Sequence, residues 1–271
     1  MLLLLQQVFL TSDELRAWGW RIPFVLGGLL AIIAAILRRD LEETPSFRKA
    51  KAAGVSGSSL RALARHPREV MLVIGLTMGG TAAFYTYTIY MQKFLRLTVK
   101  LPEIQVTLVT AGSLIVAMIL QPIYGALSDR IGRKALLTGF GVAGTLFTIP
   151  LLKALGAVHD PWMALLLISV AWMIVSGYTS INAVVKAELF PAGIRATGVG
   201  LPYALTVSIF GGTAEPIALW FKSLGHEDWF ALYLTGCIFL SLLVYSLMRD
   251  TKQNSAIARE EEAADQSEIV G

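Results

Sequence analysis

The sequence predicts an all-α polytopic membrane protein with seven transmembrane helices. Hydrophobic residues make up 55% of the chain, charged residues only 15%, and the mean hydropathy is +0.63, which is far from the composition of soluble domains. Long apolar runs recur near the length of roughly 20 residues that a helix needs to cross a bilayer. The charges gather between these runs, as expected for a chain that crosses a membrane repeatedly.

The seven predicted spans follow one another at 22–37, 70–92, 104–127, 134–152, 161–183, 198–221 and 229–248. The connections at 93–103, 153–160 and 222–228 are short, so consecutive helices must run antiparallel and pack as neighbours. The segment MLLLLQQVFL at 1–10 is too short to cross and lacks the basic start and cleavage site of a secretory signal. We expect it to be the end of a preceding helix.

The distribution of basic residues predicts which connections are cytoplasmic. Sixteen of the 23 lysines and arginines fall in 38–69, 130–134, 186–195 and the tail after 248, and cytoplasmic connections carry such an excess. The carboxyl terminus is then cytoplasmic as well. Because topology accounts for the net charge of +4, we expect the lipid bilayer, and no nucleic acid, as the partner of this basic chain.

The spans divide into two groups at a long connector. Residues 38–69 mix charge, Gly and Ser, which suits a cytoplasmic linker between helix groups. This linker separates 1–37 from a six-helix group at 70–248. The acidic, weakly apolar residues of 249–271 predict a disordered tail.

The stretch GALSDRIGRK at 125–134 places two glycines, an acid and three cations between two spans: Gly125, Asp129, Arg130, Gly132, Arg133 and Lys134. The glycines permit a close helix crossing and a tight turn, and the acid can accept hydrogen bonds from helix-start amides. With the cations facing the cytoplasm, we predict a rigid charged latch. The alternative is an ordinary basic inner loop with a helix cap.

The full pattern G-x-L-S-D-R-x-G-R-K resembles the signature loop of the major facilitator superfamily, in which this loop helps to hold one closed state. Further stretches are similar to the metabolite:proton symporter branch of that family: GWRIPF (19–24), LEETPSF (41–47), FYTYTIYMQK (84–93), KAELFPAGIRATGVGL (186–201) and FGGTAEPIALWFKSLG (210–225). The resemblance runs from residue 2 to residue 248.

The resemblance implies a twelve-helix fold of two six-helix halves, in which 1–10 matches the end of the fifth helix and 22–37 the sixth. The earlier helices and a second signature loop are then not in this chain, and the amino-terminal half is an expected partner. The resemblance also implies a location in the cell (inner) membrane. The expected activity is symport of protons with a small carboxylate, α-ketoglutarate first, by alternating access driven by the proton gradient without a cofactor.

Other functions remain open at this point. Citrate, shikimate or a proline- or betaine-like zwitterion are alternative substrates, and a fragment that transports nothing is an alternative of a different class. A membrane-embedded hydrolase would need a nucleophile–base pair or a metal cluster in the spans, and the sequence offers neither convincingly. We therefore do not expect an enzyme.

Glu215 is the most informative single residue, because a carboxylate within a span is costly unless it faces a cavity or a partner. Ser208, Gly211 and Gly212 precede it at helical spacing and predict a small, polar helix face. We predict that Glu215 carries the coupled proton and helps to form the substrate site. The alternative is an ion pair with Lys222 or with a neighbouring helix.

A second polar stripe follows the predicted span 70–92. Its members are Thr77, Thr81, Tyr85, Thr88 and Gln92, with Lys93 at the outer end. Hydroxyls and an amide can bind the oxygens of a small carboxylate, and a lysine attracts an anion. We predict substrate contacts for Tyr85, Gln92 and Lys93, with interhelical hydrogen bonds and a lysine reaching out to the interface as the alternative.

Arg21 lies at the outer end of the span 22–37, between Trp20 and Pro23. Its guanidinium matches the two oxygens of a carboxylate, so we predict a substrate contact. The alternative is an interfacial anchor in an aromatic belt with Trp18 and Trp20.

Several other residues yield weaker predictions. Gly139, Gly141 and Gly144 spell GxGxxG inside a span with no strand before it, so we expect helix packing there and no nucleotide site. The three histidines, His66, His159 and His226, fall in different connections without metal-ligand spacing, so no metal site is predicted. Gln121 and Asn182 either line the transport path or link helices.

Overall fold

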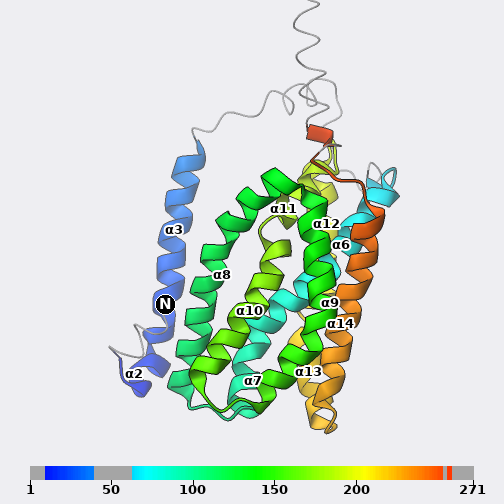
Figure 1. Cartoon of the computed structure of the whole chain (residues 1–271). Coiled ribbons are helices and arrows are strands. Elements are labelled where there is room, and N and C mark those ends of the chain that lie inside the picture. The colour runs from blue at the N-terminus through cyan, green and yellow to red at the C-terminus, as the bar shows by residue number, and fades with distance from the viewer. Residues whose placement is uncertain (1–9, 40–62, 253–254, 258–271) are drawn as a thin grey trace, which may run out of the picture. The chain divides into compact units, whose positions relative to one another are not determined.

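The computed structural model describes residues 10–39, 63–252 and 255–257. The chain divides into two compact units, Met1–Arg48 and Lys49–Gly271. The first carries α2, η1 and α3, and the second carries all later elements (Figure 1). The helix end expected at 1–10, apart from residue 10, and most of the predicted linker, 40–62, lie outside the described residues.

The first unit presents one long apolar helix. A capping box starts α2 (Ser12–Ala17). The Thr11 hydroxyl accepts a hydrogen bond from the Glu14 amide, and the Glu14 carboxylate accepts one from the Thr11 amide. The turn η1 (Gly19–Arg21) leads into α3 (Ile22–Arg39). No residue of α3 is buried within the described structure, and Phe24 is 72% exposed. Such a surface needs lipid or another helix against it.

The second unit contains six helical spans joined by short turns. They are α6 with η2 and α7 (Pro67–Tyr85, Thr86–Tyr90, Met91–Leu97), α8 (Glu103–Ile131), α9 (Arg133–Ala157), α10 with α11 (Pro161–Thr179, Asn182–Glu188), α12 with η3 and α13 (Arg195–Thr206, Val207–Gly211, Ala214–Ser223) and α14 (Glu227–Leu247). Counting α3, seven of the described helices are long and apolar enough to cross a membrane. The seven predicted spans are confirmed, with ends that shift by up to five residues.

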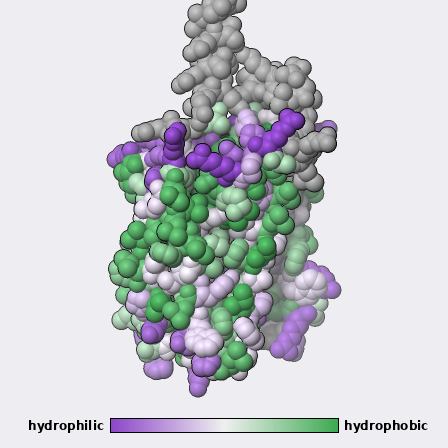
Figure 2. Space-filling model, turned by 90° about the vertical axis from the view of Figure 1, so that its right-hand side faces the viewer, coloured by the Kyte–Doolittle hydropathy of each residue, from purple (hydrophilic) through white to green (hydrophobic). Residues whose placement is uncertain are grey.

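The six spans pack around a core rich in aromatic residues. α14 packs on α9 and α6, α10 packs on α8 and α9, and α12 packs on α6. Trp172, Tyr90 and Phe140 are among the largest fully buried side chains. The outside is also apolar: Trp162 is 76% and Leu247 82% exposed. In Figure 2, hydrophobic side chains form a broad band on the face shown, with hydrophilic side chains gathered above it. This is the surface of a helix bundle solvated by lipid.

Among the described glycines, Gly79 of α6 makes the closest approach to the backbone of another helix, which is α14. A side chain at Gly79 would meet the α14 backbone at 2.6 Å, so only glycine permits this approach. There Ser241 Oγ accepts the Gly79 amide at 2.8 Å and donates to the Gly75 carbonyl at 2.6 Å. The Tyr245 hydroxyl donates to the Leu76 carbonyl at 2.9 Å. We call these contacts the α6–α14 seam.

Two spans contain a π-helical turn. η2 and η3 are π-helical turns, and each wide turn adds a residue that shifts the side chains beyond it around the helix. The spans predicted at 70–92 and 198–221 are present, but the polar faces predicted for them are not continuous across these turns. Gly211 in η3 is buried against Thr81 and Tyr85, whereas Ser208 and Gly212 are exposed.

Candidate functional site

A cavity of about 470 Å³ opens within the second unit between α6, α8, α10, α11 and α12. Its volume falls in the range of small-molecule sites. Its polar lining residues are Thr81, Tyr85, Thr88, Gln121, Tyr178, Thr179, Asn182 and Tyr203. Apolar walls come from Phe84 and Trp172, among others, whose rings meet edge to face at 6.0 Å. Hydroxyls and amides on an apolar frame can orient a small polar solute.

The two amides that line this cavity are held in place. Thr179 Oγ1 donates to Gln121 Oε1 at 3.0 Å, and Gln121 Nε2 donates to Ser176 Oγ at 3.3 Å. Asn182 Nδ2 donates to the Thr179 carbonyl at 2.8 Å. Gln121 thus links α8 to α10, as one of the two alternatives predicted, and it also lines this cavity; its place on a transport path stays a prediction.

The π turn η2 divides the polar stripe predicted for α6. Tyr85 and Thr88 line the cavity, whereas Thr77, which precedes them in α6, is fully buried. Gln92 is exposed and does not line the cavity. A substrate contact in this cavity therefore remains a prediction for Tyr85, and the structure places Gln92 elsewhere because the wide turn shifts its direction.

Glu215 and Lys93 form an ion pair between α13 and α7. Their side chains are 24% and 41% exposed, respectively, so the pair is partly shielded from solvent. The structure thus brings together two residues that the sequence predicted separately as substrate contacts. Neither lines the cavity between α6 and α12.

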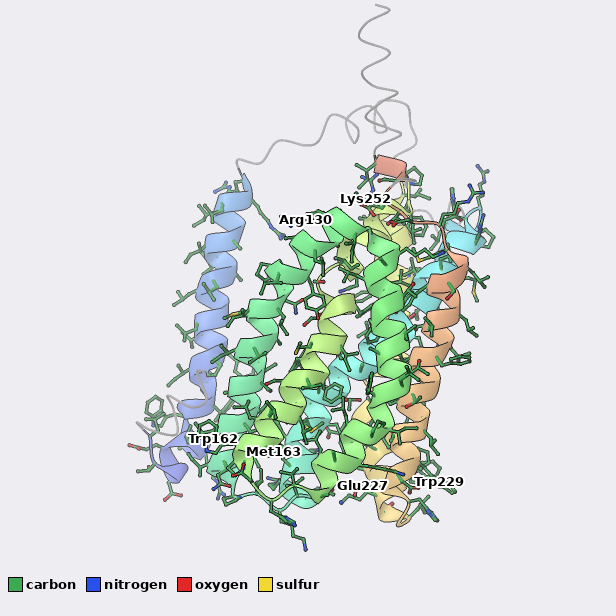
Figure 3. The ribbon with its side chains drawn as sticks, in the orientation of Figure 1. Arg130, Trp162, Met163, Glu227, Trp229 and Lys252 are labelled. Carbon is green, nitrogen blue, oxygen red and sulfur yellow. The ribbon has the colours of Figure 1, made fainter. Side chains whose placement is uncertain are left out.

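Of the two alternative partners predicted for Glu215, Lys222 is wrong because it is engaged elsewhere, whereas an ion pair with a neighbouring helix is what the structure shows, with Lys93 of α7. Lys222 Nζ lies 2.9 Å from Glu227 Oε2 and 2.6 Å from Thr98 Oγ1. Glu227 also accepts hydrogen bonds from Thr98 at 2.6 Å and from Tyr90 at 3.1 Å. This cluster joins the ends of α7, α13 and α14. Figure 3 shows Glu227 and Trp229 at the end of the bundle opposite Arg130 and Lys252.

Arg21 makes its described contacts within the first unit. Its Nη1 donates to the Ala17 carbonyl at 2.6 Å, and its guanidinium lies 4.4 Å from the centre of the Trp20 ring. These contacts agree with an interfacial anchor. A carboxylate contact for Arg21 stays a prediction.

The signature loop is shorter than predicted. α8 continues through Asp129 to Ile131, so the turn consists of Gly132, and α9 begins at Arg133. The acid that accepts the helix-start amide is Asp250, at 3.2 Å from the Arg133 nitrogen, and not Asp129. Asp129 instead accepts from the Arg133 guanidinium at 2.6 Å.

Arg133 does not face the cytoplasm as predicted, because its side chain is only 16% exposed. Its guanidinium also donates to Ser128 Oγ at 2.5 Å and lies 3.8 Å from Glu188 Oε1 in α11. Glu188 in turn accepts from Thr251 at 2.5 Å. The loop is therefore tied to α11 and to the segment after α14.

The two loop glycines have different roles. Gly132 has φ +96°, and a side chain there would meet the Asp250 carboxylate, so the predicted tight turn is confirmed. Around Gly125 a side chain would find no atom of the described chain within 4 Å. The close helix crossing predicted at Gly125 is therefore absent from the described structure.

The residues after α14 hold this loop from outside. Lys252 Nζ donates to the carbonyls of Asp129 and Arg130 at 2.5 and 3.4 Å. Lys134 Nζ donates to the Ser246 carbonyl at 2.8 Å. Residues 250–252, which the sequence assigned to a disordered tail, thus make defined contacts. Residues 253–254 and 258–271 lie outside the described part.

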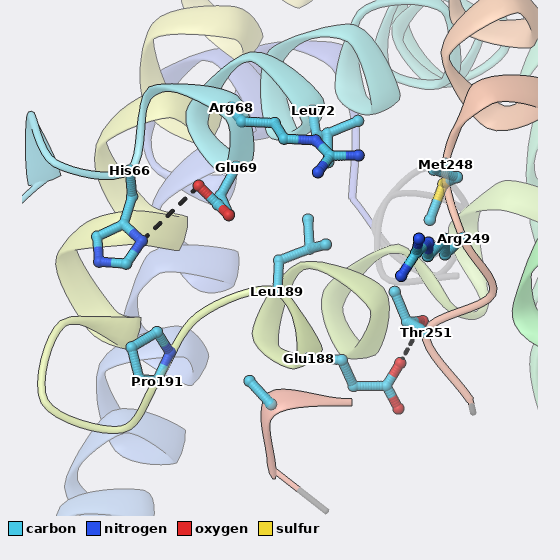
Figure 4. Close-up of a pocket in the computed structure, with 11 residues that line it drawn as sticks. His66, Arg68, Glu69, Leu72, Glu188, Leu189, Pro191, Met248, Arg249 and Thr251 are labelled. Atoms are coloured by element: carbon cyan, nitrogen blue, oxygen red, sulfur yellow. Dashed lines mark hydrogen bonds and ion pairs between the residues drawn. The ribbon is translucent and has the colours of Figure 1, made fainter. Parts of the chain in front are cut away.

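A second cavity, of about 490 Å³, lies next to these residues (Figure 4). Its two carboxylates have partners within the chain: Glu69 lies 3.7 Å from His66, and Glu188 bonds Thr251. Two cations also line this cavity: Arg68 comes from α6 and Arg249 from the segment after α14. Mixed charges that are partly paired already suit a helix-end cluster more than a ligand site.

Lys186 is the residue that the charge count misplaced. The count of basic residues assigned Lys186 to a cytoplasmic connection, but it lies in α11 and is only 1% exposed. Lys186 lies beyond the apolar run 161–183 from which this span was predicted, whereas α11 continues the span past the end of that run. The visible signal was a lysine within one turn of a predicted span end.

Among the described residues, no group of three or more His, Cys, Asp or Glu side chains is placed to hold a metal ion.

Comparison with known proteins supports the family resemblance that the sequence motifs indicated. The sequence profile of the Major Facilitator Superfamily matches residues 82–269. Alpha-ketoglutarate permease of Escherichia coli (strain K12) is 46% identical over 238 residues, which cover 88% of this chain and 54% of that protein. No solved structure matches.

More distant relatives carry other transporter names. The citrate-proton symporter of Salmonella typhi is 30% identical over 212 residues, 78% of this chain and 49% of that protein. The shikimate transporter of Escherichia coli (strain K12) is 25% identical over 252 residues, 90% of this chain and 57% of that protein. The chain spans about half the length of the curated relatives it matches.

Proposed function

Because this chain belongs to the major facilitator superfamily, we propose that it is the carboxyl-terminal part of a proton-coupled symporter for a small carboxylate, with α-ketoglutarate as the first candidate. The chain is a multi-pass membrane protein by its seven apolar helices and its family. We further propose that it resides in the inner membrane with its carboxyl terminus in the cytoplasm, in keeping with its basic connections.

The observation that carries the proposal is the polar cavity between α6, α8, α10, α11 and α12. In alternating access, a substrate site between two halves is exposed to each side in turn. The cavity offers one wall of such a site, with hydroxyls and fixed amides that match carboxylate and carbonyl oxygens. α-Ketoglutarate is preferred because the relative named for it is 46% identical, against 30% for the citrate symporter.

Glu215 is the proposed proton carrier, with Lys93 as the cation that it releases on protonation. A carboxylate that loses its charge also loses its ion pair, so proton uptake and movement of α13 against α7 can be linked. η3 separates α12, which lines the cavity, from α13, which carries Glu215. The same helical span therefore contributes to both the cavity and the ion pair.

The test uses a chimera in which the amino-terminal helices of the Escherichia coli permease precede this chain. In cells that lack their own permease, we expect uptake of radiolabelled α-ketoglutarate that a protonophore abolishes. Unlabelled citrate, shikimate and proline serve as competitors, and the amino-terminal helices alone serve as the control. A chimera that reaches the membrane but takes up only a zwitterion, or nothing, would contradict the proposal.

The same assay separates proton coupling from substrate binding. Glu215→Gln should abolish uptake driven by a pH gradient and spare exchange of internal for external substrate. Uptake with an unchanged response to the pH gradient would remove Glu215 as the proton carrier.

A further inference from the structure

We propose that Lys186 is the cation that binds a carboxylate of the substrate in the cavity between α6 and α12. This inference rests on the proposed function and deepens it, because it names the charged group that selects the substrate. The substrate class is a small carboxylate with a net negative charge, in preference to a zwitterion.

The surroundings of Lys186 are polar but neutral. Its Nζ lies 3.0 Å from Asn182 Oδ1 and 3.5 Å from the Tyr178 hydroxyl. The ammonium also stands 4.0 Å from the centre of the Tyr203 ring. These are two hydrogen bonds and a cation–π contact, and none of them supplies a negative charge.

Buried or half-buried acids of the second unit already have partners. Glu188, two residues along α11, faces Arg133 and Thr251. Glu215 pairs with Lys93, and Glu227 with Lys222. No carboxylate among the described residues forms an ion pair with Lys186. A buried cation without a counter-ion is costly in a membrane-spanning helix and is retained where function uses it.

The cavity begins where the shell around Lys186 ends. Tyr178, Asn182 and Tyr203 each contact Lys186 and also line the cavity. A single layer of side chains therefore separates the ammonium from the space available to a solute. A rotamer change of Asn182, or a small displacement of Tyr203, brings a bound carboxylate within reach of the ammonium.

The remainder of the cavity suits the other end of such a substrate. Thr81, Tyr85 and Thr88, from α6 and η2, also line the cavity and carry hydroxyls. One end of a small dicarboxylate would meet the cation while its other oxygens meet hydroxyls. A zwitterion would bring a second positive charge into the same small space and is disfavoured by charge repulsion.

The test measures thermal unfolding of the purified 271-residue chain in lipid nanodiscs, with and without α-ketoglutarate. Lys186→Met removes the charge and keeps the length, and Lys186→Gln also keeps a hydrogen-bonding group. The matched controls are Lys153→Met and Lys153→Gln, since Lys153 is an exposed lysine outside the cavity. Proline serves as the zwitterionic probe.

We expect α-ketoglutarate to raise the melting temperature of the unchanged chain and of both Lys153 variants. In the Lys186 variants, the concentration for half of this effect should rise at least about tenfold, because a buried charge partner is lost. Without ligand, the Lys186 variants should melt no lower than the unchanged chain, since an uncompensated cation is gone. A purely structural lysine would give the opposite shift.

Three results would overturn the inference. Undiminished stabilisation of the Lys186 variants by α-ketoglutarate would show that another group binds the carboxylate, and the proposed function would stand. Unfolding of both Lys186 variants would show a structural role. Absence of any carboxylate effect on the unchanged chain would also end it, and uptake by the chimera would then decide whether the proposed function falls too.

Discussion

Among single residues, the Lys93–Glu215 pair makes the sharpest prediction about stability. Lys93→Gln and Glu215→Gln should each destabilise the protein by about 1 kcal/mol or less, because the pair is partly exposed. The double variant should lose less than the sum of the two, since either single change already breaks the same ion pair. Equilibrium unfolding in mild detergent measures all three.

The control for this cycle combines Glu215→Gln with Lys222→Gln. Lys222 pairs with Glu227 and not with Glu215, so these two effects should add. Coupling between Glu215 and Lys222 that equals the coupling with Lys93 would contradict the ion pair seen here.

The sequence identified polar residues within spans more readily than it identified their partners. Glu215, Lys93 and Tyr85 were recognised because charged and polar side chains are rare in apolar helices. Their partners depend on η2 and η3, and a π turn leaves no mark in the hydrophobic pattern. Lys186 was missed because counting basic residues assigns any lysine beyond an apolar run to a connection.

Among the helical elements, the turn between α8 and α9 offers a matched pair of glycines. Gly132→Ala should destabilise the protein by about 1–3 kcal/mol, since its backbone conformation is almost restricted to glycine and the new methyl would press on Asp250. Gly125→Ala, inside α8 with open space around it, should be neutral or stabilising by up to about 1 kcal/mol.

Thermal unfolding of the two variants, monitored by circular dichroism, checks this prediction. Equal effects at both glycines would contradict the turn geometry. The comparison also bears on the predicted latch, because the Gly132 turn is where the segment after α14 grips α9.

The existence and order of the helices could be predicted from length and hydropathy alone. Their ends could not, because α8, α9 and α11 each continue past the apolar run into residues that bind one another at the bundle's end. Asp250 shows why: its contact with the Arg133 amide joins residues 117 positions apart, and no local pattern predicts such a pair.

For the whole molecule, the testable property is its orientation in the membrane. In a background with Cys237→Ala, we compare Ala64→Cys and Ala154→Cys, since both alanines are exposed, Ala64 just before α6 and Ala154 in the last turn of α9. In intact cells, a thiol reagent that cannot cross the membrane should label Ala154→Cys and spare Ala64→Cys. Labelling of both after the cells are opened is the control, and the reverse pattern would invert the proposed topology.

The overall architecture was the most predictable level, because a membrane permits few folds. Backbone groups in lipid must be satisfied within helices, so seven apolar runs define seven helices. The signature loop then pointed to the family, which the profile match over 82–269 confirms. The polar cavity that four of the six spans of the second unit line required the structure.

The α6–α14 seam also constrains how the protein is made. Its bond between Gly79 and Ser241 joins residues 162 positions apart, so the first span of the second unit meets its closest neighbour only after the last span has left the ribosome. Until then, the glycine surface of α6 lacks its partner within the bilayer. We therefore expect the insertion machinery or a chaperone to shelter this surface of α6 during synthesis, and chains released before α14 to be degraded.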